Sequence, residues 1–179
     1  MSLVISDTKS STLEPLKKNR WFLQFTSIPG QTQTESDMLA FCCHTGNRPT
    51  IDISEEKSDR LNEQFYIAGK PTWSGLDFGF YDYIQGPKSA TNILYEWSKK
   101  VYNPITGQMG FKTDYTTSAV IAMLDPMGGI VQVWNLFYCW PQKISWDNMD
   151  AGDTALSNVT LTLKYDYAIK PQDINTSGM

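Results

Sequence analysis

Hydrophobic and polar residues alternate most regularly near the carboxyl end of the chain. Between residues 159 and 169 every second position is apolar or aromatic, as in a half-buried β-strand. The buried face of this predicted strand would consist of Val159, Leu161, Leu163, Tyr165, Tyr167 and Ile169. The preceding run, residues 130–140, is apolar on both faces at several positions. We expect it to be covered on one side by the protein's own core and on the other by a further surface.

Shorter runs predict additional strands earlier in the chain. They are residues 20–28, 38–46, 64–68, 72–83 and 115–124, and residues 125–129 predict a hairpin turn between the last strands. A polar loop is predicted at 31–37, before the second of these strands. Residues 52–63 are the most charged part of the chain, and we expect an exposed hairpin tip, loop or short helix there.

One helix is predicted, at about 88–102. Ser89 is suited to cap its amino end, and a single apolar stripe follows at Ile93, Leu94, Trp97 and Val101. On the exposed side Glu96 and Lys100 have the spacing of an i,i+4 ion pair. Asn103-Pro104 ends the helix, and a glycine-containing loop over 103–114 follows.

The elements together predict a mainly β (α+β) fold. We expect two packed antiparallel β-sheets forming a barrel-like sandwich with the one flanking helix. Residues 1–18 are interpreted as an amino-terminal arm, residues 19–170 as a single domain, and residues 171–179 as a polar tail.

Composition adds an indication that part of the surface is hidden in an assembly. Of the 179 residues 13% are aromatic and only 19% are charged, and interfaces are rich in aromatic residues and poor in lysine and glutamate. An ordinary β-domain with a large aromatic core remains the alternative. The net charge of −4 disfavours a nucleic-acid-binding surface but allows DNA to pass. The sequence contains neither a membrane-spanning apolar run nor a signal-peptide core, and we expect a reducing cytoplasm as the site of synthesis.

Candidate chemistry is sparse. Cys42, Cys43 and His44 are adjacent, whereas structural zinc sites separate their cysteines by at least two residues, so we expect no metal. A carboxylate spacing of three at Asp147, Asp150 and Asp153 differs from that of calcium loops and predicts a solvated turn. Phosphate loops and nucleophile motifs are missing from the sequence. We therefore expect no cofactor and no enzymatic activity.

The order of the segments resembles the tail tube proteins of contractile-tailed phages of the T-even type. The similarity runs from about Asn19 to Ala168. It includes NRWFLQF after a short arm, IAGKPTWSGLDFGFYD, the helix with its Glu96-Trp97 pair, SAVI (118–121), WNLFYCWPQKISWD (134–147) and VTLTLKYDYA (159–168). The segments at 52–63 and 103–114 fit less well, and the tail lies beyond the resemblance.

This resemblance implies a structural virion protein. Six copies would form a ring whose inner strands join into a β-barrel around a channel, and the rings would stack into a tube inside a contractile sheath. Its partners would be further copies of itself, the sheath, the tape-measure protein, and the baseplate and terminator proteins. DNA would pass through the lumen without specific binding. The protein would reside in the phage tail after assembly in the cytoplasm of the host bacterium.

Candidate contact residues follow from exposure and pattern. For contacts between subunits or rings we propose Glu55, Glu56, Lys57, Asp59, Arg60, Trp134, Leu136 and Trp140. The channel-facing candidates are Thr160, Thr162, Lys164 and Asp166, on the polar side of the alternating strand. The arm and the tail are candidates for clasping neighbouring subunits.

Two alternatives stay open. The first is a tube initiator or terminator, or a related tube protein of a contractile injection system. The second is a carbohydrate-binding β-sandwich that uses its tryptophans.

Overall fold

The computed structural model of the chain describes residues 15–84 and 86–171. Most of the predicted arm and of the predicted tail therefore lie outside the described residues. The strands are β1 (Trp21–Phe25), β2 (Cys43–Gly46), β3 (Ile51–Arg60), β4 (Glu63–Trp73), β5 (Leu76–Tyr81), β6 (Thr117–Leu124), β7 (Ile130–Trp146), β8 (Asn158–Lys164) and β9 (Tyr167–Ile169). The helices are α1 (Gln33–Cys42), α2 (Ala90–Val101) and α3 (Lys112–Tyr115), with a 3-10 turn at Gly86–Lys88.

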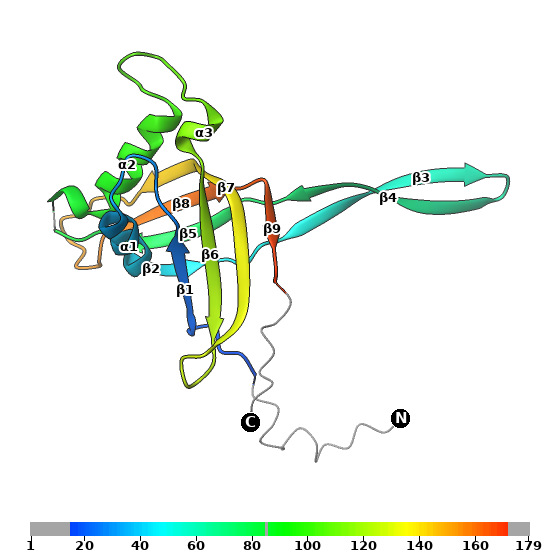
Figure 1. Cartoon of the computed structure of the whole chain (residues 1–179), viewed down its shortest axis with the longest axis horizontal. Coiled ribbons are helices and arrows are strands. Elements are labelled where there is room, and N and C mark those ends of the chain that lie inside the picture. The colour runs from blue at the N-terminus through cyan, green and yellow to red at the C-terminus, as the bar shows by residue number, and fades with distance from the viewer. Residues whose placement is uncertain (1–14, 85, 172–179) are drawn as a thin grey trace.

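Seven strands form one antiparallel sheet that folds over on itself. The order is β1-β6-β7-β8-β5-β2, and β9 also pairs with β7. The long strand β7 belongs to both halves: it pairs with β6 and β9 in one half and with β8 in the other. In Figure 1 the half with β1, β6 and β7 crosses in front of the half with β8, β5 and β2. The predicted mainly β fold with antiparallel pairing is confirmed.

A local irregularity in β7 marks the change from one half to the other. Tyr138 has a φ of 56°, in the left-handed region that residues other than glycine seldom adopt. The pairing with β6 ends at Cys139, and the pairing with β8 begins at Trp140. On the facing strand the predicted run 159–169 is interrupted at the same level, and the backbone N–H of Asp166 donates to the Phe137 carbonyl at 3.1 Å. The single predicted strand is therefore two strands, β8 and β9.

The barrel is not closed. β1 and β2 stand at opposite ends of the strand order and are not paired with each other within the described chain. A cavity of about 280 Å³ lies between Trp21 of β1 and Gly46 at the end of β2. The predicted barrel-like sandwich is therefore open in a single subunit, and closing it would need strands that come from outside this subunit.

The core lies between the two sheet halves and under α2. Trp97 of α2 is fully buried, packs edge-on against Phe25 of β1 at 5.8 Å, and donates its indole N–H to the Tyr115 carbonyl at 2.8 Å. The predicted stripe residues Ile93 and Leu94 are buried beside it. The helix therefore packs its buried face against the core of the sheet.

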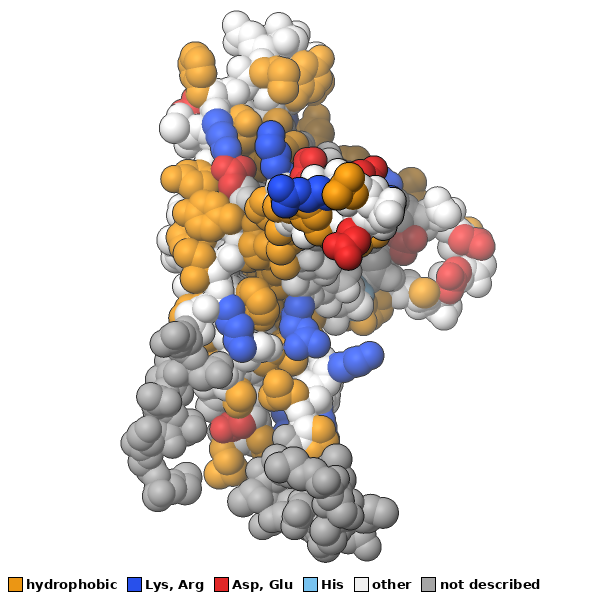
Figure 2. Space-filling model, turned by 90° about the vertical axis from the view of Figure 1, so that its right-hand side faces the viewer, with side chains coloured by type: hydrophobic (Ala, Val, Ile, Leu, Met, Phe, Trp, Pro, Cys, Tyr) orange, Lys and Arg blue, Asp and Glu red, His pale blue; other side chains and the backbone are white. Residues whose placement is uncertain are grey.

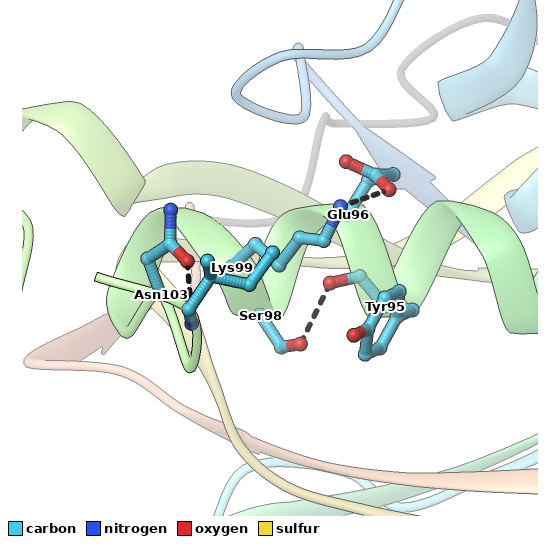
Figure 3. A network of polar contacts seen from close by, with 6 residues as sticks. Tyr95, Glu96, Ser98, Lys99 and Asn103 are labelled. Atoms are coloured by element: carbon cyan, nitrogen blue, oxygen red, sulfur yellow. Dashed lines mark hydrogen bonds and ion pairs between the residues drawn. The ribbon is translucent and has the colours of Figure 1, made fainter. Parts of the chain in front are cut away.

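The predicted amino-terminal cap of α2 is confirmed. The predicted ion pair of Glu96 on the exposed side is also present, but with a different lysine. The Asn92 backbone N–H donates to the Ser89 hydroxyl at 3.3 Å, as expected for the cap. Glu96, however, pairs with Lys99 at 2.6 Å, one position before the predicted Lys100 (Figure 3). The hydrogen bond to Glu96 raises the pKa of Lys99. The i,i+3 spacing serves as well as i,i+4 on a helix surface.

The prediction was wrong for residues 33–42. The predicted polar loop and the beginning of the predicted strand 38–46 form α1, and only Cys43–Gly46 is extended. Thr32 and Glu35 explain the helix, because the Glu35 backbone N–H donates to the Thr32 hydroxyl while the Glu35 carboxylate accepts from the Thr32 backbone N–H at 2.7 Å. This reciprocal capping satisfies amide groups that would otherwise lack partners at the start of the helix.

The charged segment 52–63 forms most of a long hairpin. Strands β3 and β4 pair from Ile51↔Trp73 out to Arg60↔Glu63, with one bulge near Ser54. Figure 1 shows the hairpin projecting away from the folded sheet. A hairpin tip was one of the predicted forms, but the charged segment forms nearly all of β3 as well as the turn. Across the described residues, none of the helices is long and apolar enough to cross a membrane.

Candidate functional site

The half of the sheet made by β5, β8 and the end of β7 has a polar outer face. Cross-strand rows place Asp77 and Lys143 on either side of Thr162, and Ser145 beside Thr160. The Thr162 hydroxyl donates to the Asp77 carboxylate at 2.6 Å. We call these five residues the polar face. They combine one carboxylate, one cation and three hydroxyls, which suits contact with water rather than with another apolar surface.

The four predicted channel-facing residues do not all lie on this face. Thr160 is exposed and Thr162 is half-buried on the polar face, and Lys164 follows them at the end of β8. The Lys164 ammonium donates to the Trp73 carbonyl at the base of the hairpin at 2.7 Å. Asp166 lies beyond β8, in an ion pair with Lys112 of α3.

Two stretches of β7 lack a strand partner on one edge in the described part of the chain. From Trp140 to Trp146 the strand pairs with β8 only, because the pairing with β6 has ended at Cys139. From Ile130 to Trp134 it pairs with β6 only, because β9 begins opposite Phe137 and ends at Asn135. β2, at the other end of the polar half, pairs with β5 only. Unpaired edges of this kind are where a sheet can continue into another chain.

The contact candidates of β7 occupy different environments. Leu136 is fully buried in the core of its own subunit, so we do not retain it as a contact residue. Trp140 is half-buried and packs edge-on against Tyr115 at 6.1 Å. Trp134 is half-buried as well, and its indole N–H is enclosed without a hydrogen-bond partner among the described residues.

Exposed aromatic residues surround the irregularity in β7. Tyr138 is 49% exposed, and the ring of Tyr167 lies 6.2 Å from its ring and 4.9 Å from that of Phe137. The ammonium of Lys112 lies 5.3 Å from the Tyr138 ring centroid. Figure 2 shows hydrophobic side chains gathered in a band on the side from which the hairpin projects. A surface of this composition is typical of protein interfaces.

The hairpin carries the other contact candidates. Glu55, Glu56, Lys57, Asp59 and Arg60 are all exposed on β3. The sequence did not single out the facing strand, where Phe65, Tyr66 and Ile67 are exposed in succession. No residue of β3 or β4 is fully buried. Because an isolated two-stranded hairpin is marginally stable in water, we expect this one to be stabilised by contacts outside the subunit.

The residues considered for metal binding or thiol chemistry are packed in the fold or hydrogen-bonded to nearby backbone. His44 stacks on Tyr81, with ring centroids 3.9 Å apart. Cys42 and Cys139 are buried, and Cys43 is half-buried. Among the described residues, no three histidine, cysteine, aspartate or glutamate side chains gather as a metal would require. The carboxylates of Asp150 and Asp153 accept hydrogen bonds from backbone amides within their own exposed loop, as in a solvated turn.

We expect the three cysteines to be unreactive in the folded protein. Burial raises the pKa of Cys43 and of Cys139 to about 12, above the ordinary value of 9.0, so almost no thiolate forms at pH 8. Ellman's reagent should therefore label no native thiol until urea unfolds the chain, whereas a Leu156→Cys variant should react at once. Because these pKa values are raised on folding, the stability that they contribute is complete below about pH 9. It is lost as the pH rises toward 12. Rapid labelling of a native thiol in the folded protein would contradict this prediction.

Comparison with known proteins confirms the resemblance. Residues 86–169 match the family described as T4-like virus tail tube protein gp19. The match covers α2, α3 and β6 to β9, which include the polar face except Asp77 and both unpaired stretches of β7. No match is found among curated proteins.

Solved structures share the fold at low sequence identity. The tube terminating cap of the anti-feeding prophage has a TM-score of 0.69 at 13% identity, over 94% of this chain and 99% of that one. The sheath/tube terminator of the extracellular contractile injection system PVC has a TM-score of 0.68 at 13% identity, over 90% and 100%. The sheath-tube complex of the same system in its extended state has a chain with a TM-score of 0.63 at 15% identity, over 97% and 100%. The chain therefore has the fold of tube and terminator proteins of contractile systems.

Proposed function

We propose that this chain, which matches the tail tube family over residues 86–169, is the subunit of a tube that assembles from stacked rings. Its role is structural rather than catalytic. In a ring of six copies, the open sheet of each subunit would continue into the next, so that the sheets close together into the barrel that a single subunit leaves open. A heterologous contact that closes in this way leaves neither of the two joined edges unpaired.

The unpaired edges of the polar half carry this proposal. β2 lies at one end of this half, and the stretch Trp140–Trp146 lies at the other. Pairing β2 of one copy with Trp140–Trp146 of the next would extend the β2-β5-β8-β7 order around a ring. The polar faces of the copies would then form one continuous surface, which lines the channel.

A lining of hydroxyls with one carboxylate and one cation per subunit suits a passage. Thr160, Thr162 and Ser145 offer hydrogen bonds to water. The charges of Asp77 and Lys143 have opposite signs, so they add no net charge to the wall. Such a wall lacks the basic groove that would retain a phosphate backbone. We infer that a tape-measure protein and then DNA, or an effector, can move along it without specific binding.

The remaining partners follow from the place of a tube in a contractile particle. The outside of the tube would contact the sheath, and its ends would contact baseplate and terminator proteins. Hairpin residues Glu55, Glu56, Lys57, Asp59 and Arg60 would contact the adjacent ring, and Trp134 and Trp140 a neighbour within the ring. The assembled protein would belong to the virion tail after assembly in the host cytoplasm.

Electron microscopy of the purified protein in negative stain tests the proposal. We expect rings with an axial hole, and tubes at higher protein concentration. Sedimentation velocity should show species of six or more subunits, because the open edges leave the monomer incomplete. A monodisperse monomer at every concentration, together with binding on a glycan array, would overturn the proposal in favour of a carbohydrate-binding sandwich.

A tube terminator is the second candidate, because the cap and terminator structures share the fold over nearly their full lengths. The two candidates differ in one property of the purified protein. A tube subunit stacks into polymers of growing length, whereas a terminator forms a single ring that does not stack. The length distribution in the same micrographs distinguishes them.

A further inference from the structure

The edge strand β2 of the polar half contains a β-bulge at His44. Cys43 pairs with Phe80 of β5. Two positions later Thr45 pairs with Gly79, the direct neighbour of Phe80. His44 is therefore an extra residue without a partner of its own on β5. A bulge of this kind redirects a side chain, and bulges are frequent next to functional sites.

The bulge places His44 and Thr45 on the outer side of the polar half. Phe78 and Phe80 are fully buried in the core, so Gly79 between them faces the outer side. A side-chain carbon at Gly79 would collide with the Thr45 hydroxyl and lie 3.2 Å from Cε1 of His44. Both side chains therefore lie over Gly79, in the space that the missing side chain leaves open.

Tyr81 holds the His44 ring on this side. The ring centroids are 3.9 Å apart, and the ring planes differ by 15°. Tyr81 is two positions from Gly79 on β5 and so points to the same side. Nδ1 of His44 is enclosed without a hydrogen-bond partner among the described residues. The side chain as a whole is only half-buried, so the ring still reaches the surface that carries the polar face.

The charged groups on the same side balance one another. Asp77 of β5 and Lys143 of β7 belong to the polar face. Lys164 lies at the end of β8, and Asp147 follows β7 and is exposed. Tyrosine phenols carry no charge in the pH range where histidine titrates. Two carboxylates and two ammonium groups add no net charge, so the charge of His44 decides the sign of this surface.

We propose that His44 makes the retention of duplex DNA by the channel wall dependent on pH. The inference rests on the proposed tube function, in which the polar faces of six copies line the channel. Histidine is the side chain whose charge changes between about pH 5 and 8. While the imidazoles of a ring are neutral, the wall has no net charge and the phosphate backbone passes. When they are protonated, every subunit adds one positive charge that attracts the phosphates.

The position of His44 makes the added charge effective. β2 is the edge strand that would join Trp140–Trp146 of the next copy in the proposed ring. The His44 rings would then lie at regular intervals around the channel, one at each boundary between subunits. Stacked rings would repeat this circle of charges along the tube, as the DNA backbone repeats its phosphates. Because the surrounding charges cancel, no excess of carboxylates would neutralise the added charge.

Retention of DNA by purified tubes at two pH values tests this inference. Tubes are mixed with a short fluorescent DNA duplex and pelleted at about pH 7.5 and at about pH 5.5. We expect at least about tenfold more DNA in the pellet at the lower pH, and release of that DNA as the salt concentration rises. Carboxylates remain ionised at about pH 5.5, and the sequence contains no other histidine. The imidazole is therefore the side chain whose titration is measured.

Two double variants with the same number of histidines locate the charge. His44→Gln alone should retain little DNA at either pH. Adding Thr160→His, on the polar face, should restore the pH-dependent retention. Adding Met127→His instead should not, because this exposed residue lies on the turn between β6 and β7, in the other half of the sheet. Sedimentation velocity at both pH values establishes that each variant assembles.

The outcomes separate this inference from the proposed function. Equal retention by native tubes at both pH values would overturn the pH-dependent wall and leave the tube proposal intact. The same follows if the variant with Met127→His regains the pH dependence, or if rings fall apart at about pH 5.5. In the last case the charge would act on the edge of β2 rather than on DNA. A protein that forms no ring at either pH would overturn both proposals, since no channel wall would exist.

Discussion

Replacing Leu136 with aspartate is expected to prevent the protein from folding. Leu136 lies in the core of the subunit, on the strand that both halves of the sheet share, and has no exposed surface. An aspartate there would lose the packing of the leucine and bury a carboxylate without a partner. Such changes exceed about 4–5 kcal/mol, against a total stability of about 5–15 kcal/mol for a typical domain.

Soluble yield, circular dichroism and urea unfolding measure this effect. Thr160→Asp is the matched control, because it adds the same charge on the exposed polar face and should unfold at nearly the native urea concentration. If Leu136→Asp remained soluble with the native unfolding midpoint, the assignment of β7 to the core of its own subunit would be incorrect.

The second large effect is expected from Trp97→Ala in α2. Removing a large buried aromatic side chain costs about 3–5 kcal/mol. Here the change also leaves the Tyr115 carbonyl without its hydrogen-bond donor and removes the edge-on contact with Phe25. We expect a monomer that still folds but unfolds at a much lower urea concentration, and assembly that becomes temperature-sensitive.

Tyr95→Ala provides the control for that prediction. Tyr95 lies on the same helix two positions away, and its ring is 41% exposed beside Lys99. Its loss should change the free energy of unfolding by less than about 0.5 kcal/mol, as is usual for surface sites. Equal destabilisation by the two alanine variants would mean that α2 does not anchor the core as described.

The elements that the sequence predicted correctly have an unambiguous pattern. In α2 the cap and the apolar stripe agree, and in β8 the alternation is strict, so local chemistry alone indicates the element. α1 was missed although Thr32 and Glu35 have the spacing of a capping box. Its buried positions include Ser36 and Cys42, which weakens the apolar stripe. Here the capping signal was more informative than the hydrophobic pattern.

The candidate contact surfaces were only partly predictable, for a different reason. A strand that is apolar on both faces does not reveal which face belongs to its own core, so Leu136 was grouped with Trp134 and Trp140. Unpaired edges depend on where the pairing of one strand passes from one neighbour to another, as where β7 leaves β6 at Cys139 and joins β8 at Trp140. The cavity between β1 and β2 combines residues of the predicted arm, β1, β6 and the segment after β2. No local pattern brings such residues together.

The length of the β3–β4 hairpin has a consequence for the geometry of any polymer built from this chain. A ten-residue strand such as β3 spans about 33 Å. If the hairpin contacts the adjacent ring, as proposed, its length sets the axial repeat. Deleting one cross-strand pair would shorten that repeat by about 3.3 Å and turn the tip to the opposite face. Deleting two pairs would restore the orientation at a shorter repeat. Evolution could therefore change the spacing of such a tube most readily in steps of two residue pairs.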